Sequence, residues 1–378
     1  MSSLDFIILY TTLFCLFFSI SQIRQKAINR NVLTWGVPII IAFVIIIGMR
    51  YGWGNDYMSY KYWMDNPKGD ENILFAEINT ILSWMGFEYV EKFMFYALCL
   101  IVGGLAFLRT FRYDKYMVTF FLPAMFFSAT FMIRQGFALS FFYLSAYYLW
   151  KRNHAIGIFL LILSIGIHTG LLSIIIFPVL FMFLHKWYKK PLPIFYTIPV
   201  YTAITIGVDY INTFFATNFT TAFTFLQYFG KFESYNENNE YWFGEEGINE
   251  IYKQSIATML MTLVFEVSII YLGAKALCRK YDKRVCIYYN SVIAGMFIMR
   301  FGFYLEIIHR IGQSIMAFYF VPLGYAFSIF LKRRVLTSMP KSERTLTITA
   351  ICCCIAFILL FYGRIILLSP EKEFIWNN

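Results

Sequence analysis

The chain alternates long apolar runs with short polar interruptions, and most runs have the length of a helix that crosses a membrane. A helix needs roughly 20 apolar residues to span the hydrocarbon core of a bilayer. The pattern therefore predicts an all-α, polytopic integral membrane protein in which residues 1–378 form a single transmembrane domain. About twelve transmembrane helices are expected, at 4–20, 32–49, 93–109, 117–133, 135–150, 155–167, 170–184, 192–208, 255–276, 286–304, 310–331 and 345–362.

Two of the apolar runs are too long for one crossing and only just long enough for two. Residues 116–150 are interrupted only by Arg134 and Gln135, and residues 155–184 only by the triplet that begins at His168. Basic residues flank the second run at both ends, so both ends are expected on the same side of the membrane. Each run therefore predicts a hairpin with its polar cluster at the turn. Ionisable groups at that depth are costly unless they face a wet cavity, which makes Arg134 and His168 candidates for a functional site.

The distribution of charge orients the predicted helices, because cytoplasmic loops carry an excess of lysine and arginine. It places both termini outside the cytoplasm and predicts two external loops, at about 50–92 and 209–254, the first with an amphipathic stretch near Ile73–Trp84. Alternate gaps hold 21 of the 32 basic residues and only three acidic ones, and these gaps are 21–31, 109–116, 151–154, 185–191, 275–285 and 332–344.

Composition narrows the class of protein further. The chain is 59% hydrophobic and 21% aromatic, which excludes an ordinary soluble domain. Its net charge of +10 follows from the cytoplasmic loops, so nucleic acid is not expected as a partner, whereas membrane lipid is.

Ionisable side chains gather near the external ends of the predicted helices. Guanidinium groups bind phosphate oxygens in a bidentate manner. Arginines that converge from several helices on one external cavity predict an anionic ligand, and the phosphate of a lipid carrier is the natural one. The external ionisable residues are Arg50, Asp56, Arg134, His168, Arg300, Glu306, His309, Arg310 and Arg364.

Several of these residues have a structural role as the alternative. Arg50 and Arg364 end their helices, so both can extend to the lipid headgroups. A neutral His168 can cap a turn. Arg300 can form a salt bridge with Glu306. The sequence leaves both interpretations open at these positions.

Two further external clusters carry candidate chemistry. The segment from Glu306 to Arg310 contains a carboxylate, the His309 imidazole and a guanidinium, which together supply an acid/base group and an electrostatic stabiliser. Aromatic rings on the external loops can stack on sugars, although an interfacial aromatic belt explains them equally well. These rings belong to Trp53, Tyr57, Tyr60, Trp63, Tyr241 and Trp242.

The motifs that are missing from the sequence also restrict the function. The sequence contains no Asp-x-Asp pair, no phosphate-binding Gly-x-x-x-x-Gly-Lys loop and no zinc-ligand spacing. ATP-driven transport and metal-dependent use of soluble nucleotide sugars are therefore disfavoured, and neither a cofactor nor a metal ion is expected. A reaction of an already activated, lipid-linked substrate outside the cytoplasm remains open.

Three short motifs, in order over roughly residues 30–180, resemble those of EpsG-like, Wzy-type polysaccharide polymerases. Arg50 to Tyr57, followed by Tyr60, is similar to the signature Arg-x-x-x-Gly-x-Asp-Tyr-x-x-Tyr. The segment 134–138 resembles an Arg-Gln-x-x-Ala turn, and 167–170 resembles an Ile-His-Lys-Ser element. Thr169 departs from the last motif, where lysine is common, so no cationic role is expected there. Beyond residue 180 the resemblance is one of topology, with Arg310 before a late helix.

The resemblance implies polymerisation of lipid-linked repeat units at the periplasmic face of a bacterial inner membrane. A growing glycan on undecaprenyl pyrophosphate would be transferred to the terminal sugar of an incoming undecaprenyl-pyrophosphate-linked unit. A protein that regulates chain length would be a further partner. A lipid-linked oligosaccharide transporter or flippase and a polyprenyl-linked glycan ligase are the alternatives.

On this interpretation, arginines stabilise the departing pyrophosphate and a base activates the acceptor hydroxyl group. Arg134 and Arg310 are the expected electrostatic catalysts, and His168 or Glu306 is the expected base. The remaining candidates are expected to contact substrate, namely Arg50, Asp56, Tyr57, Gln135, Arg300 and His309.

Overall fold

A computed structural model of the chain describes residues 2–24, 32–52, 57–66, 73–111, 115–130, 132–168, 170–211, 255–303, 306–368 and 373–374. The described residues are helical apart from turns and two short strands, β1 (Arg50–Tyr51) and β2 (Glu373–Phe374). The helices are α1 (Ser2–Arg24), α2 (Val32–Gly48), α3 (Tyr57–Asp65), α4 (Ile73–Trp84), α5 (Tyr89–Leu108), α6 (Lys115–Thr130), α7 (Ile133–Trp150), α8 (His154–Ile167), α9 (Leu171–Leu184), α10 (Ile194–Ile206), α15 (Ile256–Arg279), α16 (Lys283–Phe301), α17 (Glu306–Met316), η3 (Ala317–Tyr319), α18 (Phe320–Phe330), α19 (Arg333–Thr337) and α20 (Lys341–Leu368).

Each helical segment expected from the hydropathy pattern coincides with a helix of the structure. The segment 310–331 is the exception in detail, since it is divided into α17, η3 and α18. The described residues of the segment 50–92, which was predicted to be an external loop, are largely helical, and α4 has the bounds of the amphipathic stretch. Most of the second predicted external loop, 209–254, lies outside the described residues.

Four described helical stretches are long and apolar enough to cross a membrane, judged by length and composition. Several other apolar helices, among them α8 and α10, are shorter. The chain therefore has the helical, apolar character of a membrane protein, whereas the number of crossings stays a prediction. The four long stretches are Tyr89–Leu108, Ile256–Arg279, Ile308–Phe330 and Lys341–Phe361.

Polar side chains fix the starting points of three helices. Asn153, Ser255 and Asp282 precede α8, α15 and α16, and each side chain accepts a hydrogen bond from a backbone N–H in the first turn of its helix. These N–H groups have no partner within the helix, so an oxygen acceptor at this position stabilises the helix end. The polar interruptions between the apolar runs thus act as helix caps.

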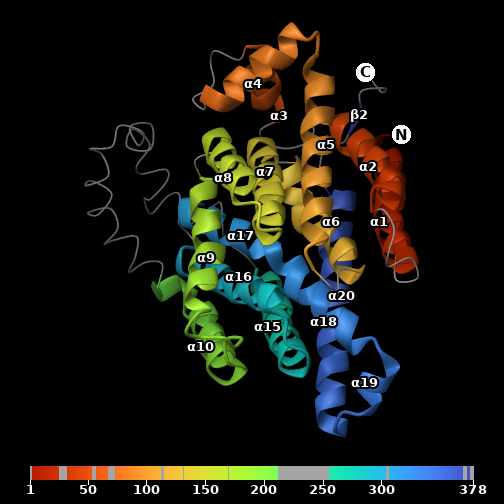
Figure 1. Cartoon of the computed structure of the whole chain (residues 1–378). Helices are drawn as coiled ribbons and strands as arrows, with labels where there is room; N and C mark the ends of the chain where they lie inside the picture. Colours follow the sequence, from red (N-terminus) through yellow and green to blue (C-terminus); the bar gives the residue numbers. More distant parts are fainter. Residues whose placement is uncertain are drawn as a thin grey trace. The chain divides into compact units, whose positions relative to one another are not determined.

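The structure divides into two compact units, which are described separately. Unit 1 comprises Met1–Ile176, Leu323–Arg333 and Ile358–Asn378. Unit 2 comprises Phe177–Pro322 and Arg334–Phe357. In unit 1, α5, α6, α7 and α8 run beside one another, with α3 and α4 at one end (Figure 1). We call this end of unit 1 the α3 end.

Close backbone contacts hold α7 against its neighbours in unit 1. A Cβ atom added at Gly103 of α5 would lie 2.5 Å from the backbone oxygen of Ser140 in α7. A Cβ atom at Gly136 of α7 would lie 2.5 Å from the backbone oxygen of Ser128 in α6. Helices that approach this closely need a residue without a side chain at the contact. These glycines therefore fix the position of α7, whose first turn carries Arg134.

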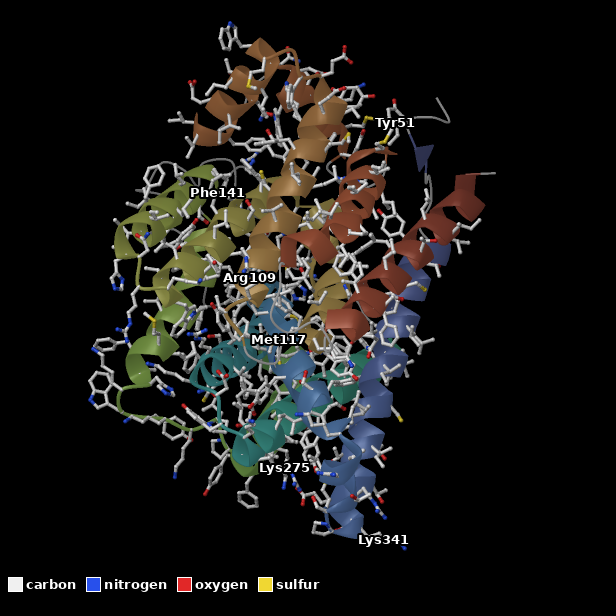
Figure 2. The ribbon with its side chains drawn as sticks, turned by 45° about the vertical axis from the view of Figure 1, so that its right-hand side comes forward. Tyr51, Arg109, Met117, Phe141, Lys275 and Lys341 are labelled. Carbon is white, nitrogen blue, oxygen red and sulfur yellow. The ribbon has the colours of Figure 1, made fainter. Side chains whose placement is uncertain are left out.

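The same kind of contact joins the late helix α18 to unit 1. The backbone of Met117 in α6, labelled in Figure 2, lies where a Cβ atom at Gly324 would have to be placed. On the other side of α6, Thr119 Oγ1 donates a hydrogen bond of 2.8 Å to Ser21 Oγ of α1. Segments from both ends of the chain thus pack on α6.

A two-stranded antiparallel sheet of β1 and β2 lies at the α3 end of unit 1. Arg50 pairs with Phe374, and Tyr51 pairs with Glu373. Tyr51 is labelled in Figure 2 beside this C-terminal strand, and β2 also contacts α1, which begins at the same end (Figure 1). The start of α1 and strand β2 thus lie at the same end of unit 1, and the placement of both termini outside the cytoplasm stays a prediction.

In unit 2, α17 folds back against α16. A Cβ atom at Gly295 would lie 2.8 Å from the Cβ atom of Ile315, and one at Gly312 would collide with the backbone of Met299. The Asn290 side chain of α16 accepts a hydrogen bond of 3.0 Å from a backbone N–H of the segment before α10. Unit 2 is therefore built around α16.

We predict that Gly103→Ala destabilises the protein, because the new Cβ atom meets backbone that cannot move cheaply. Overpacking of this kind typically costs about 1–3 kcal/mol. Gly363→Ala is the matched control, since nothing lies within 4 Å of its Cβ position in α20. The midpoint of thermal unfolding of the purified protein should fall for Gly103→Ala and not for Gly363→Ala. Equal midpoints would contradict the close contact of α5 and α7.

Candidate functional site

The buried face of α3 contacts three cationic side chains at the α3 end of unit 1. The buried residues of this helix are Tyr57, Tyr60 and Met64. Their spacing of three and four residues places them on a single face of the helix. Tyr57 contacts Arg50, Tyr60 contacts Arg134, and Met64 contacts Lys92 through its carbonyl oxygen. Two tyrosines of the motif recognised between residues 50 and 60 thus contact the guanidinium groups of Arg50 and Arg134.

Arg134, the second residue of α7, is cradled by aromatic rings. Its guanidinium carbon lies 5.0 Å from the ring centroid of Trp63, 5.3 Å from that of Phe75 and 5.9 Å from that of Tyr60. These rings come from α3 and α4. The faces of aromatic rings attract a cation, more strongly when water is excluded, and leave its formal charge in place. The arrangement therefore stabilises a half-buried guanidinium at this position.

His168 lies beside Arg134, because the two hairpins pack against each other. Ser164 Oγ of α8 donates a hydrogen bond of 2.8 Å to the carbonyl of Ala138 in α7, and Ser145 of α7 bonds in return to Gly157 of α8. His168 caps the end of α8, between α8 and α9. The sequence predicted both turns as polar clusters, and the structure brings them together.

The environment of His168 favours the neutral imidazole. Burial first, and the neighbouring Arg134 cation second, lower the pKa of His168 to about 4. A neutral imidazole can accept a proton at ordinary pH. A side chain at Gly170 would displace the ring, since its Cβ atom would lie 2.9 Å from His168 Nε2.

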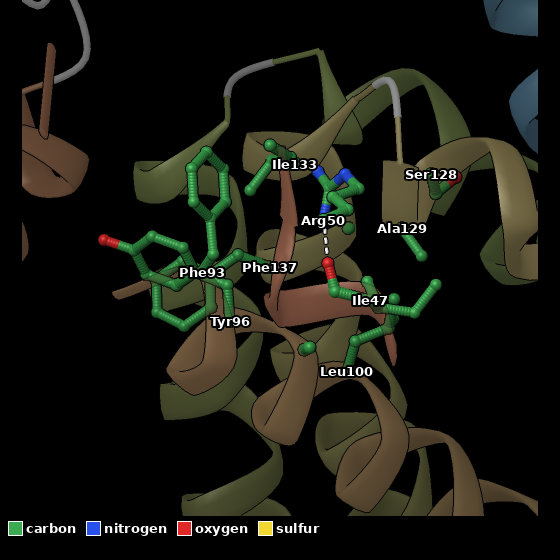
Figure 3. A pocket seen from close by; sticks show the side chains of 11 residues that line it. Ile47, Arg50, Phe93, Tyr96, Leu100, Ser128, Ala129, Ile133 and Phe137 are labelled. Atoms are coloured by element: carbon green, nitrogen blue, oxygen red, sulfur yellow. Dashed lines mark hydrogen bonds between the residues drawn. The ribbon is translucent and has the colours of Figure 1, made fainter. Parts of the chain in front are cut away.

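Arg50 is fully enclosed, with 1% of its surface exposed. One terminal nitrogen donates to the carbonyl of Ile47, and the other donates to the carbonyl of Thr130 at 3.1 Å. The rings of Tyr57 and Phe93 stack at 4.9 Å and lie 5.7 and 5.2 Å from the guanidinium carbon. Figure 3 shows Arg50 beside a cavity that has room for about one water molecule.

Lys92 is a buried cation that the sequence did not single out. Its side chain is 2% exposed, and its Nζ donates to the Met64 carbonyl at 2.5 Å and to Ser83 Oγ at 2.7 Å. These bonds join α3 and α4 to the start of α5. In the sequence, a lysine one residue before a predicted crossing is indistinguishable from one that reaches the headgroups.

Unit 2 contains a separate buried ion pair. Arg300 donates to Glu266 Oε2 at 2.6 Å and to the Tyr201 hydroxyl at 3.0 Å, and Tyr201 also donates to Glu266. All three side chains are at most 1% exposed. Glu266 is therefore a carboxylate partner of Arg300. The pairing with Glu306 stays a prediction, since the side chain of Glu306 lies outside the described residues. A lone carboxylate in the apolar run 255–276 was the signal that could have identified Glu266.

The other candidates of unit 2 lie on α17. His309 packs edge-on against the ring of Phe303, with centroids 5.3 Å apart, and Arg300 lies 5.5 Å from the same ring. Arg310 is exposed. The two sets of candidates thus fall in different units, with Arg50, Tyr57, Arg134, buried Gln135 and His168 in unit 1, and Arg300, His309 and Arg310 in unit 2.

Three of the residues that the sequence predicted near the site lie wholly or in part outside the described structure. Asp56 lies outside the described residues, as do the side chains of Glu306 and Arg364. In the described part of the chain, no three side chains of His, Cys, Asp or Glu gather at a spacing suited to a metal ion. The described site of unit 1 combines the Arg134 guanidinium and the His168 imidazole with the aromatic rings around Arg134.

We predict that Arg300→Met strongly destabilises the protein, because it leaves the Glu266 carboxylate buried without its counter-ion. Breaking a buried ion pair typically costs about 3–5 kcal/mol. The double variant Glu266→Met/Arg300→Met removes both charges and should be more stable than either single variant. Thermal unfolding of the four proteins measures the coupling. Additive losses in the double variant would show that the two side chains do not act as a pair.

Comparisons with known proteins give one assignment. A search of curated proteins and a search of solved structures found no match. The model of the EpsG family matches residues 33–377, which is most of the chain and includes the α3 end of unit 1, α15, α16 and α17. The family expected from the sequence is thereby confirmed. The chain belongs to the EpsG family.

Proposed function

We propose that the protein polymerises a bacterial surface polysaccharide from lipid-linked repeat units. Membership of the EpsG family supports a glycosyltransferase-like, polysaccharide polymerase kind of function. The observation that carries the proposal is the pairing of Arg134 with a neutral His168 at two adjoining hairpin turns. The donor is a growing glycan on undecaprenyl pyrophosphate, and the acceptor is an undecaprenyl-pyrophosphate-linked repeat unit. The reaction takes place at the periplasmic face of the inner membrane.

The proposed reaction is a substitution at the anomeric carbon of the donor glycan. The terminal hydroxyl oxygen of the acceptor forms a bond to that carbon, and the bond to the pyrophosphate oxygen breaks. Undecaprenyl pyrophosphate leaves with the electron pair, and the hydroxyl proton passes to His168. The leaving group is already activated, so the main tasks are to stabilise its developing charge and to receive one proton.

Arg134 is suited to the first task. A fixed guanidinium in a water-poor surrounding stabilises a developing phosphate charge more than it would in water. The rings of Tyr60, Trp63 and Phe75 restrict the orientation of this side chain. Arg300 of unit 2 is 1% exposed and paired with Glu266, so we propose that it stabilises its own unit rather than contacting substrate. The electrostatic role expected for Arg310 and the substrate contact expected for His309 are proposals for unit 2 alone.

His168 is suited to the second task once substrate is bound. In the free protein, burial first and the Arg134 cation second lower the pKa of His168 and so disfavour the protonated imidazole. A diphosphate beside Arg134 would offset that cation and add its own negative charge, so proton transfer to His168 becomes easier. The base is thus strengthened only when the leaving group is in place. Glu306 is the alternative base.

Aromatic residues around the same cations supply a surface for the sugars. Half-buried Trp63 lies beside Arg134 and offers such a surface, whereas Tyr57 is 1% exposed and covers Arg50. Aromatic rings offer flat, rigid contact area for an apolar sugar face. The acceptor glycan would therefore approach along α3, with Gln135 and Asp56 as hydrogen-bonding partners. A protein that regulates chain length remains a proposed partner.

We predict that Arg134→Ala lowers the rate of chain elongation by about 10²–10³-fold, the usual cost of losing one preorganised donor. Arg134→Lys should recover little if the guanidinium grips the phosphate in a bidentate manner. The control is Arg109→Ala, which removes an exposed arginine at the end of α5. The assay follows product length on lipid-linked repeats with purified protein. Wild-type product lengths from Arg134→Ala would exclude the proposed role.

Surface glycans of cells that lack the protein discriminate between the proposal and transport. A polymerase defect leaves single repeat units on the surface, whereas loss of a transporter leaves no repeat units outside.

We predict that the activity has two different acidic limits. A base works when it is deprotonated, so the rate falls as the pH drops through its pKa. The limit for kcat/KM reports the free protein and should lie near pH 4, whereas the limit for kcat reports the substrate complex and should lie higher. His168→Gln should abolish the shift between the two limits. Identical limits in the wild-type protein would contradict the coupling of His168 to bound diphosphate.

A further inference from the structure

Arg50 occupies the meeting point of two helix ends. Its guanidinium donates to the carbonyl of Ile47, in the last turn of α2, and to the carbonyl of Thr130, the last residue of α6. The final carbonyl groups of a helix lack intrahelical partners and carry a partial negative charge. A guanidinium that binds one carbonyl from each helix therefore satisfies both ends and holds them together.

Thr130 is separated from Arg134 by a very short connection. Helix α6 ends at Thr130, and α7 begins at Ile133. The contact of Gly136 with Ser128 holds the first turn of α7 against the last turn of α6. A shift of the Thr130 carbonyl would therefore be transmitted directly to the backbone of Arg134.

The surroundings of Arg50 fix it in this place. The stacked rings of Tyr57 and Phe93 cover its guanidinium, and its backbone pairs with Phe374 in the short sheet. With 1% exposure and both terminal nitrogens donating to backbone, the side chain faces helix ends rather than solvent. Arg134 is half-buried, so its side chain is more accessible to solvent than that of Arg50.

We infer that Arg50 is a positioning residue, which ties the end of α6 to the end of α2 and thereby sets the α6–α7 turn that presents Arg134. This inference rests on the proposed role of Arg134 and assigns Arg50 a different task from direct binding of substrate. The motifs that begin at Arg50 and at Arg134 then act together, because the Arg50 side chain orients the Arg134 side chain.

The test combines a structural readout with a kinetic one, in the full-length purified protein. Hydrogen–deuterium exchange is measured for peptides that cover 126–137, with peptides of α15 as the internal reference. Arg50→Met should raise exchange in the α6–α7 turn by about tenfold, as expected for the loss of charged hydrogen bonds. Arg50→Lys, which can bond to one carbonyl at a time, should be intermediate. Arg109→Gln removes an exposed arginine and should leave this turn unchanged.

The kinetic readout asks whether Arg50 acts through Arg134. A slight misplacement of a catalytic group can cost about 100-fold, so elongation by Arg50→Met should fall by that order. In an Arg134→Ala background, Arg50→Met should add almost no further loss, because the group that it positions is absent. Arg50→Lys should recover part of the rate only when Arg134 is present.

Two results would overturn the inference. Unchanged exchange of the α6–α7 turn in both Arg50 variants would show that Arg50 does not hold it. Additive losses of elongation in the double variant would make Arg50 an independent contact to substrate. The exchange measurement does not depend on activity, so it still tests Arg50 if the wild-type protein fails to elongate glycans and the proposed function itself is wrong.

Discussion

A guanidinium group below a membrane surface is tolerated only when its surroundings replace the hydration that it loses. Three buried or half-buried arginines meet this constraint in three different ways. Arg300 is paired with the Glu266 carboxylate, Arg50 binds the carbonyls of two helix ends, and Arg134 lies among aromatic rings. A carboxylate neutralises the cation, a carbonyl group offsets it in part, and a ring face leaves its formal charge in place. Arg300 is thus bound to its carboxylate and Arg50 to its carbonyl groups, and Arg134 is the arginine for which we propose an anionic ligand.

The packing of the helices determines where these charges meet. Glycine contacts bring α7 close to α5 and α6, and serine hydrogen bonds hold α8 on α7. Two short hairpins packed in this way place their turns side by side, so Arg134 and His168 become neighbours although 33 positions separate them in the numbering. Helix α3 then covers both Arg50 and Arg134 with one face. The chemistry of the site thus depends on contacts between helices that lie away from the reacting groups.

The sequence predicted the helices well, because apolar length and charge asymmetry report directly on membrane insertion. The hairpin turns at Arg134 and His168 could be located for the same reason, and so could the helical stretch Ile73–Trp84. Partners of buried charges could not be predicted, since they depend on which helix faces which. Glu266 and Lys92 are examples, and the bond from Arg50 to Thr130 is another. A single sequence shows that a buried charge needs compensation but does not show which group provides it.

The central claim of the proposal is that the Arg134 guanidinium binds a diphosphate. The affinity of the protein for undecaprenyl pyrophosphate tests this claim most directly. Binding to wild-type protein, Arg134→Ala and Arg109→Ala would be measured in detergent micelles at one ionic strength. Charged hydrogen bonds are typically worth about 1.5–3 kcal/mol. The account predicts that the dissociation constant rises by at least about tenfold for Arg134→Ala and stays at the wild-type value for Arg109→Ala. Equal affinities for the wild-type protein and Arg134→Ala would contradict it.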